Sequence, residues 1–524
     1  MTARTLARAG LILTLAFFIS RVLGWLRLVV ISTSFGAEGD LDAYFAAFRI
    51  PDLIFQLVAA GAISSALIPV LSQLLGNDEE ARAWRVVSTV INLMLLALLG
   101  LSVFVAVFAP VLIPFFTPGF DVVQNELTVR LTRLMLLSPV LLALGAIASS
   151  VLNTQGRFAA SAMAPLLYNL AIIVAAVVLA PLMGVEALAI GVVVGSLLHL
   201  LVQLPALVGR RRFKYDFQMD LGDSAARQSL LLMAPRALGL GTTQITFLVN
   251  TTLASGLGTG SIVAYNVAFT VLQIPLGVIG LPLGVVLLPS MSRAIASGAT
   301  REFAAIVLRS LRLLLYVMLF LTAITMVLRR QVVTMLFDYG RFDERAIDLT
   351  ANTLLYFLIG LAGHSMIVIL ARAFYSAQDT RTPVTAAIIS VGVNVLVSVA
   401  TVGTLGLSGL ALGIAAGAWV EAGILVVLLW QRTPGIHLES LVRAMVEFLI
   451  GSVLSALAAV GVVRLTEGLV GTDPVKVLVI AQSAAAFAAA VAVYVAYSWL
   501  LRIPELPQLF SLTRSMLPHR FRGG

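Results

Sequence analysis

Apolar residues follow one another along nearly the whole chain, in runs long enough to cross a bilayer, with short polar or Gly/Pro-rich breaks between them. A hydrocarbon core of about 30 Å requires roughly 20 apolar residues for each helical span. The pattern therefore predicts an all-α, polytopic membrane protein of about fourteen transmembrane helices. The expected spans are 9–35, 42–75, 84–114, 127–152, 159–181, 184–208, 228–254, 260–292, 303–328, 346–375, 383–404, 406–431, 440–464 and 474–501.

The composition agrees with a membrane domain and argues against a set of soluble ones. Of the 524 residues, 60% are hydrophobic and 11% are charged, whereas a soluble domain carries roughly 25% charged residues. The first apolar run contains Arg21 and Arg27 and lacks a small-residue cleavage pattern, so we interpret it as a retained helix and not a signal peptide. The chain has no cysteine, which excludes disulfides and thiolate metal sites.

Basic residues are concentrated in alternate breaks, which predicts that both termini are cytoplasmic. The segments placed inside contain Arg4, Arg8, Arg82, Arg85, Arg157, Arg210, Arg211, Arg212, Lys214, Arg293, Arg301, Arg381, Arg432, Arg514, Arg520 and Arg522. Opposite segments such as Gly36–Leu41 contain neither Lys nor Arg, although one outside loop with Arg329, Arg330, Arg341 and Arg345 disagrees. This asymmetry explains the net charge of +9 by membrane orientation and anionic lipid, without nucleic acid.

A faint internal repeat indicates a two-lobed transporter. The segment from Gln155 to Asn169 is echoed by the one from Gln378 to Asn394. Copies about six spans apart keep one orientation, so the halves would be parallel repeats, unless the similarity between apolar helices is due to chance. Glycines four residues apart, Gly191 with Gly195 and Gly413 with Gly417, fit close helix packing.

Ionisable residues inside the spans are the candidates for function, because a charge near the bilayer centre costs about 2.5–3.5 kcal/mol and usually faces a partner or a wet cavity. They cluster at Arg21, Arg27, Asp42, Arg49 and Asp52. Asp42 and Arg49 are seven residues apart and hence on nearly one helix face, which favours a cavity wall. The alternative is that Asp42 and Asp52 neutralise the arginines and only join helices.

Arginine suits a pyrophosphate, because its planar fork donates two parallel hydrogen bonds and stays charged. Arg236, beside Pro235 in the seventh expected span, is a further candidate. The predicted substrate-binding residues are therefore Arg21, Arg27, Arg49, Asp42 and Arg236. Glu421 and Glu447 could couple to a cation or proton, or be paired by a neighbouring helix. No catalytic or metal site is predicted, since no P-loop, G-x-S-x-G or H-E-x-x-H motif occurs.

Several motifs resemble the MurJ (MviN) family of lipid II flippases, in the multidrug/oligosaccharidyl-lipid/polysaccharide exporter superfamily. They include Ser20–Arg27, Asp42–Phe45, Phe48–Pro51, Thr117–Phe120, Arg157-Phe158, Leu288–Ser290, Tyr339-Gly340 and Phe374–Pro383, in the order and spacing of the family. The resemblance covers nearly the whole chain.

The resemblance implies two six-helix lobes in parallel pseudo-repeat plus two C-terminal helices that form a lipid-facing groove. The implied segments are 1–208 for the N-terminal lobe, 209–227 for a basic cytoplasmic linker, 228–432 for the C-terminal lobe, 433–501 for the two extra helices and 502–524 for a basic cytoplasmic tail. It also implies a multi-pass protein of the bacterial plasma (inner) membrane, not an enzyme, that exports lipid II or a similar polyprenyl-pyrophosphate glycolipid by alternating access.

No cofactor is expected, although the membrane potential or a monovalent cation could couple to transport, and cell-wall synthesis proteins are possible partners. Arg21, Arg27 and Asp42 match family cavity positions, whereas family charges are replaced by Phe55, Ala60, Phe269 and Thr270. Those departures keep three alternatives open: a flippase for another polyprenyl-linked glycan, a cation-coupled drug exporter, and a non-transporting scaffold of cell-wall synthesis. An exporter of cationic drugs would need an acidic cavity, and the arginines indicate the opposite.

Overall fold

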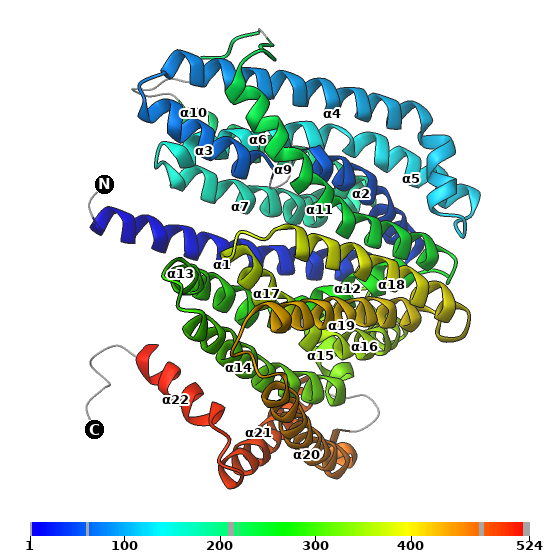
Figure 1. Cartoon of the computed structure of the whole chain (residues 1–524). Coiled ribbons are helices and arrows are strands. Elements are labelled where there is room, and N and C mark those ends of the chain that lie inside the picture. Colours follow the sequence, from blue (N-terminus) through cyan, green and yellow to red (C-terminus); the bar gives the residue numbers. More distant parts are fainter. Residues whose placement is uncertain (1–2, 59–61, 208–213, 218, 471–475, 517–524) are drawn as a thin grey trace. The chain divides into compact units, whose positions relative to one another are not determined.

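A computed structural model of the chain describes residues 3–58, 62–207, 214–217, 219–470 and 476–516; the side chains of some helical residues, among them 234–240, are not described. Within these ranges every regular element is a helix, which confirms the predicted all-α class (Figure 1). The first helices are α1 (Ala3–Phe35), α2 (Gly39–Val58), α3 (Ala62–Gly76), α4 (Glu80–Phe116), α5 (Val122–Met135), α6 (Leu137–Thr154), α7 (Phe158–Val174), π-helix η1 (Ala175–Leu179), α8 (Ala180–Met183), α9 (Glu186–Leu201), α10 (Leu204–Leu207) and α11 (Ser224–Ser255). They are followed by α12 (Ser261–Pro275), π-helix η2 (Leu276–Gly280), α13 (Leu281–Ala296), α14 (Thr300–Val327), α15 (Arg329–Phe337), α16 (Glu344–Ile359), α17 (Leu361–Ser376), α18 (Arg381–Leu405), α19 (Leu407–Arg432), α20 (Leu438–Val470), α21 (Lys476–Leu500) and α22 (Glu505–Met516).

The chain divides into two compact units. Unit 1 comprises Met1–Val263 and Tyr339–Ala346, and unit 2 comprises Ala264–Asp338 and Ile347–Gly524. Helix α11, which the sequence assigned to the C-terminal lobe, packs in unit 1 against α2, α3 and α4. The boundary between compact units therefore lies after α11, while the lobe boundaries inferred from the family stay a prediction.

The helices have the lengths and composition of membrane spans. Among the described residues, 11 helices are long and apolar enough to cross a bilayer, and α16 with α17, bent by 46°, raises the number to 12. The two other expected spans, 42–75 and 228–254, correspond to α2 with α3 and to α11. A multi-span membrane protein is confirmed, and the total of fourteen spans stays a prediction.

Helix α4 shows how one span serves both lipid and protein. Its exposed large residues recur every three or four positions, as a single helix face requires: Leu96, Leu99, Val103, Val107 and Val111. The residues between them, such as Leu98, Val105 and Ile113, are buried in a core shared with α2, α3 and α6. The exposed stripe is the lipid-facing surface of α4.

Glycines set the separation of neighbouring helices in both units. A Cβ on Gly195 of α9 would lie 2.8 Å from the carbonyl oxygen of Tyr168 in α7. In unit 2, a Cβ on Gly417 of α19 would lie 2.8 Å from the carbonyl oxygen of Ser390 in α18. The predicted close packing through small residues is confirmed, and it recurs between corresponding helix pairs of the two halves.

Arg341 and Arg345, two of the unexpected arginines in the loop predicted to lie outside, belong to unit 1. The Arg341 guanidinium donates to both carboxylate oxygens of Glu38 at 2.8 Å, and its backbone N–H donates to the Thr33 carbonyl at 2.8 Å. Gly340 has φ of +61° and lies so close to Thr33 that a Cβ would be 2.3 Å from the Thr33 carbonyl oxygen. The Tyr339-Gly340 motif is therefore a backbone contact that only glycine permits, and Glu38 balances one of the arginines.

The two extra C-terminal helices are attached to α14 in unit 2. The Tyr494 hydroxyl of α21 donates to the Tyr316 carbonyl at 2.8 Å, and the Phe448 ring of α20 meets the Tyr316 ring edge-on at 5.2 Å. At the end of this group, Arg312 and Glu505 form an ion pair of 2.6 Å. Helices α20 to α22 are thus joined to the helical body by buried polar contacts as well as apolar packing.

The start of α11 is joined to the start of α4. The Asp223 carboxylate caps α11 by accepting from the Ala225 N–H at 2.7 Å, and it accepts from Arg82 Nε at 2.7 Å. The hydrogen bond from Arg82 lowers the pKa of Asp223 below its ordinary value. One carboxylate therefore both starts a helix and pins it to a second helix.

This lowered pKa predicts a dependence of stability on pH. A carboxyl whose pKa is lower in the folded state stabilises the fold above its ordinary pKa of about 3.9, and the contribution is lost as the pH falls through the folded-state value. In thermal unfolding in detergent, we expect Tm to fall more between pH 7 and acidic pH for the natural chain than for Asp223→Asn. The asparagine can still cap α11, but it carries no charge to pair with Arg82. Asp121→Asn is the control, because Asp121 caps α5 through the Gln124 N–H (2.7 Å). Equal pH dependence of Asp223→Asn and the natural chain would contradict this role.

Candidate substrate-binding site in unit 1

Arg27 lies where α1 packs against α7. Its guanidinium carbon is 5.8 Å from the centroid of the Tyr168 ring, and the two side chains also share a hydrogen bond. Gly24, one turn earlier on α1, would place a Cβ 3.9 Å from the Asn169 side-chain oxygen, so the two helices approach closely here. The half-buried Arg27 is therefore held by a phenol, through a cation–π contact and a hydrogen bond.

Arg49 and Asp52 lie on α2, on the side toward α11. Arg49 Nε donates to the Thr251 hydroxyl at 3.3 Å, and its guanidinium carbon lies 4.8 Å from the Phe247 ring centroid. Asp52 accepts from the side chain of Gln56 at 3.5 Å and from Gln244 of α11. Both ionisable residues thus have partners on α11, the helix that the sequence placed in the other lobe.

These residues form one polar cluster, defined as Arg27, Arg49, Asp52, Tyr168 and Gln244. Asp52 interacts electrostatically with both arginines. Two guanidinium groups and one carboxylate leave one positive charge, which suits an anionic group. The contacts of Asp52 agree with the alternative that this acid neutralises the neighbouring arginines. The two arginines, which together carry more charge than Asp52 can neutralise, agree with binding of an anion.

Asp42 is buried and accepts hydrogen bonds from the backbone at the start of α12. Its side chain is 1% exposed, and its oxygens accept from the backbone N–H groups of Gly260 at 2.5 Å and Val263 at 2.8 Å. These N–H groups belong to the first turn of α12 and its preceding residue, where a carboxylate satisfies donors that the helix leaves unpaired. The contacts of Asp42 favour helix capping, and substrate binding by this residue stays a prediction.

The contacts of the described residues do not connect the two other predicted substrate-binding residues, Arg21 and Arg236, to the polar cluster. Arg21 is exposed on α1, about one and a half turns before Arg27. Arg236 lies in α11, but its side chain is outside the described residues. The structure therefore brings Arg27 and Arg49 into one cluster and leaves the roles of Arg21 and Arg236 as predictions.

The acids considered for ion coupling have protein partners in unit 2. Glu447 accepts from Arg443 Nε at 2.9 Å, and Glu421 of α19 is hydrogen-bonded to the Ser390 side chain of α18. Within the part of the chain that is described, no group of three or more His, Cys, Asp or Glu side chains could hold a metal ion. Partnering by a neighbouring residue is thus the observed state of both acids, and cation coupling is untested.

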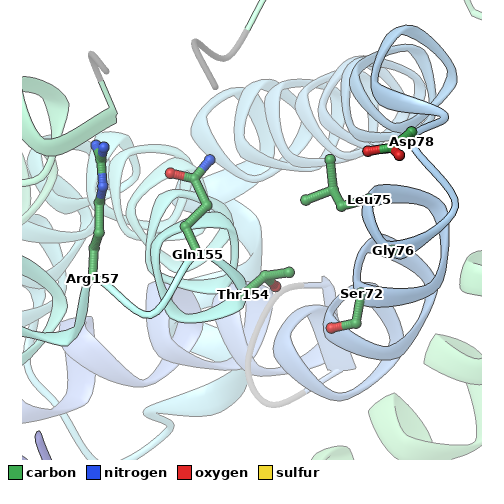
Figure 2. Close-up of a pocket in the computed structure, with 7 residues that line it drawn as sticks. All are labelled: Ser72, Leu75, Gly76, Asp78, Thr154, Gln155 and Arg157. Atoms are coloured by element: carbon green, nitrogen blue, oxygen red, sulfur yellow. The ribbon is translucent and has the colours of Figure 1, made fainter. Parts of the chain in front are cut away.

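A separate polar hollow of about 600 Å³ lies in unit 1, between the end of α3 and the turn after α6 (Figure 2). It is lined by Ser72, Leu75, Gly76, Asp78, Thr154, Gln155 and Arg157. Arg157 Nη1 donates to the Ala206 carbonyl at 2.5 Å, so this arginine also holds the end of α10. The hollow contains none of the predicted substrate residues.

Comparison with known proteins decides the family. A family model described as "Lipid II flippase MurJ" matches residues 31–479. The lipid II flippase MurJ of Burkholderia cenocepacia is 34% identical over 442 residues, which cover 80% of this chain and 83% of that protein. This chain belongs to the MurJ family. The probable lipid II flippase MurJ of Vibrio cholerae is 29% identical over 451 residues, with 83% and 84% covered.

Solved structures show the same fold. A structure of lipid II flippase MurJ in an inward closed conformation matches with a TM-score of 0.79 at 23% identity, covering 94% of this chain and 98% of that one. An inward-facing multidrug resistance MATE family transporter of the MOP superfamily matches with a TM-score of 0.67 at 17% identity, covering 80% and 97%. The fold predicted from the MurJ resemblance is confirmed, and it is shared with a transporter of the MATE family.

The positions where this MurJ relative departs from the expected family charges are filled by packing. Phe55 packs against the apolar core of unit 1. In unit 2, the Phe269 ring meets the Phe357 ring edge-on at 5.5 Å, and the Thr270 hydroxyl donates to the Asn266 carbonyl at 2.8 Å. Ala60 lies outside the described residues. The replaced charges at 55, 269 and 270 are therefore accommodated within each unit without unpaired groups at those side chains.

Sequence reasoning missed Tyr168 and Gln244, which complete the polar cluster. Tyr168 adjoins Asn169, which ends one copy of the internal repeat, but a tyrosine in an apolar span is usually an ordinary packed residue. Gln244 is uncharged and so escaped a search restricted to ionisable groups. A search of the spans for every hydrogen-bonding side chain would have found both.

The capping role of Asp42 predicts a loss of stability when the carboxylate is removed. Asp42→Ala leaves buried N–H groups unpaired, at a cost of about 1–3 kcal/mol, and Asp42→Asn should lose less because its side-chain oxygen still accepts. Thermal unfolding of the purified variants measures both. An Asp42→Ala protein with an unchanged Tm and lost transport would contradict capping and indicate a substrate role.

Proposed function

We propose that this chain is a lipid II flippase that exports the polyprenyl-pyrophosphate-linked cell-wall precursor across the bacterial plasma membrane by alternating access. Its membership of the MurJ family supports this activity. The observation that carries the proposal at the residue level is the polar cluster of unit 1, in which Arg27 and Arg49 both interact with the Asp52 carboxylate.

The chemistry of the cluster fits the charged part of such a substrate. Pyrophosphate oxygens accept the parallel N–H groups of a guanidinium, and Tyr168 and Gln244 hold the cluster without neutralising it. Arg21, exposed on the same helix as Arg27, is available to meet the substrate before the cluster does. An inside-negative potential favours outward movement of an anion by about 2.3 kcal/mol per charge per 100 mV, so the membrane potential would contribute to export of a pyrophosphate.

Rescue of a lipid II flippase depletion strain tests this function. We expect the natural chain to restore growth and an Arg21→Ala plus Arg27→Ala variant to fail, because loss of a charged hydrogen bond costs about 1.5–3 kcal/mol, or roughly 10–100-fold in binding. The matched control is Arg130→Ala plus Arg443→Ala, since these arginines have side-chain exposures of 65% and 83%.

The outcomes separate the rival functions. Rescue by the natural chain and the control, but not by Arg21→Ala plus Arg27→Ala, supports lipid II export through the cluster. Failure of a well-expressed, membrane-inserted natural chain contradicts it. In that case, retained binding of lipid-linked sugar would favour a scaffold or a flippase for another glycan, to which the replaced charges at Phe55 and Phe269 already point.

A further inference from the structure

The segment between α10 and α11 carries a row of exposed apolar side chains. The apolar row is defined as Tyr215, Phe217, Met219 and Leu221, whose exposed fractions are 49%, 85%, 52% and 56%. These residues alternate with Asp216 and Asp220, and Lys214 precedes them and is also exposed. An exposed row of this kind outside the spans marks a contact surface.

Hydrogen bonds to α4 hold the segment that carries the apolar row. The backbone N–H of Asp216 donates to the Ser88 hydroxyl at 2.9 Å, and that of Asp220 donates to the Thr89 hydroxyl at 3.1 Å. Asn92 Nδ2 donates to the Asp216 carbonyl at 3.3 Å. Together with the Arg82–Asp223 ion pair of 2.7 Å, these contacts fix the segment against three turns of α4.

The aromatic rings contact each other and leave their outer faces open. The Tyr215 and Phe217 rings are 6.4 Å apart and meet edge-on at 88°. The Tyr215 hydroxyl donates to the Asn92 side chain at 2.5 Å. The Tyr215 hydroxyl and the backbone N–H groups of Asp216 and Asp220 are thus bonded to α4, and the exposed apolar side chains are left for another surface.

The position of the row along α4 identifies that surface. The lipid-facing stripe of α4 begins at Leu96, and the residues that hold the segment, Ser88, Thr89 and Asn92, precede it by four to eight positions. At 1.5 Å per helical residue they lie about 6–12 Å beyond the first lipid-facing residue. The headgroup layer occupies about 5–8 Å outside the hydrocarbon core. Tyr215, whose hydroxyl is bound to Asn92 about 6 Å beyond Leu96, therefore lies in this layer, and the positions bound to Ser88 and Thr89, about 10–12 Å beyond Leu96, lie at its outer edge.

We propose that the apolar row is an interfacial anchor that inserts into the headgroup layer of an anionic membrane, with Lys214 against the lipid phosphates. Tyrosine and phenylalanine side chains suit this depth. The exposed Lys214 complements a lipid phosphate, whereas the Asp220 carboxylate accepts from the Gly222 and Asp223 N–H groups of its own turn. The anchor holds the segment that leads into α11 at the membrane surface, while α4 fixes its polar side. The inference is independent of the transported substrate.

The absence of natural cysteines makes a direct test possible. Phe217→Cys in the full-length chain gives a single thiol for an environment-sensitive fluorophore, measured in proteoliposomes of phosphatidylcholine alone or with phosphatidylglycerol. The matched control is Asn77→Cys, because Asn77 is exposed and precedes Glu80, the first residue of α4, which is roughly 24 Å of helix from Leu96.

We expect lipids with a nitroxide at the headgroup or a shallow acyl position to quench the label at 217 several-fold more than the label at 77, and more strongly in the anionic vesicles. Lys214→Gln in the Phe217→Cys background should reduce the preference for anionic vesicles and preserve the quenching. Equal quenching at 217 and 77 in both compositions would overturn the proposal. Protection of the thiol at 217 in cells, without quenching in vesicles, would also overturn it and indicate a protein partner.

Discussion

The cost of placing a charge in the hydrocarbon layer is the constraint on which the first unit depends. Arg27 of α1 and Arg49 of α2 can occupy spans because polar side chains surround them, and those side chains come from α2, α7 and α11. Satisfying two guanidinium groups therefore requires these helices to pack as they do. The cluster is at once a condition for folding in the membrane and a positively charged place for an anion.

The same constraint accounts for polar contacts elsewhere in the molecule. Asp42 is buried because it satisfies the unpaired N–H groups at the start of α12. Asp223 both begins α11 and joins it to Arg82, and the segment before it is bound to hydroxyl and amide groups of α4. Helix ends and connections near the membrane surface are thus fixed by specific hydrogen bonds, while the spans themselves are held by apolar packing and close glycine contacts.

Sequence alone was sufficient for the helical class, the membrane location and the family, because long apolar runs and the Ser20–Arg27 type of motif are local signals. It also identified Arg27 and Arg49, since a charge in an apolar span is conspicuous. It could not reveal that Asp42 caps α12, because the sequence of α2 does not show which backbone N–H groups will pack against it in the fold. Tyr168 and Gln244 were missed for a related reason, since the side chains that they contact, Arg27 and Asp52, lie more than 100 positions away in the sequence. The apolar row at Tyr215–Leu221 has too few residues to indicate a span. Its proposed contact with the membrane could be inferred only from its position along α4 in the structure.

Binding of lipid II to the purified chain tests the central claim most directly, that Arg27 in the polar cluster holds the pyrophosphate. The comparison is between the natural protein, Arg27→Gln and the exposed-site control Arg443→Gln, each checked for an unchanged Tm. The account predicts that Arg27→Gln binds about 10–100-fold more weakly and that Arg443→Gln binds as the natural chain does. An Arg27→Gln protein that binds lipid II with the natural Kd would contradict it.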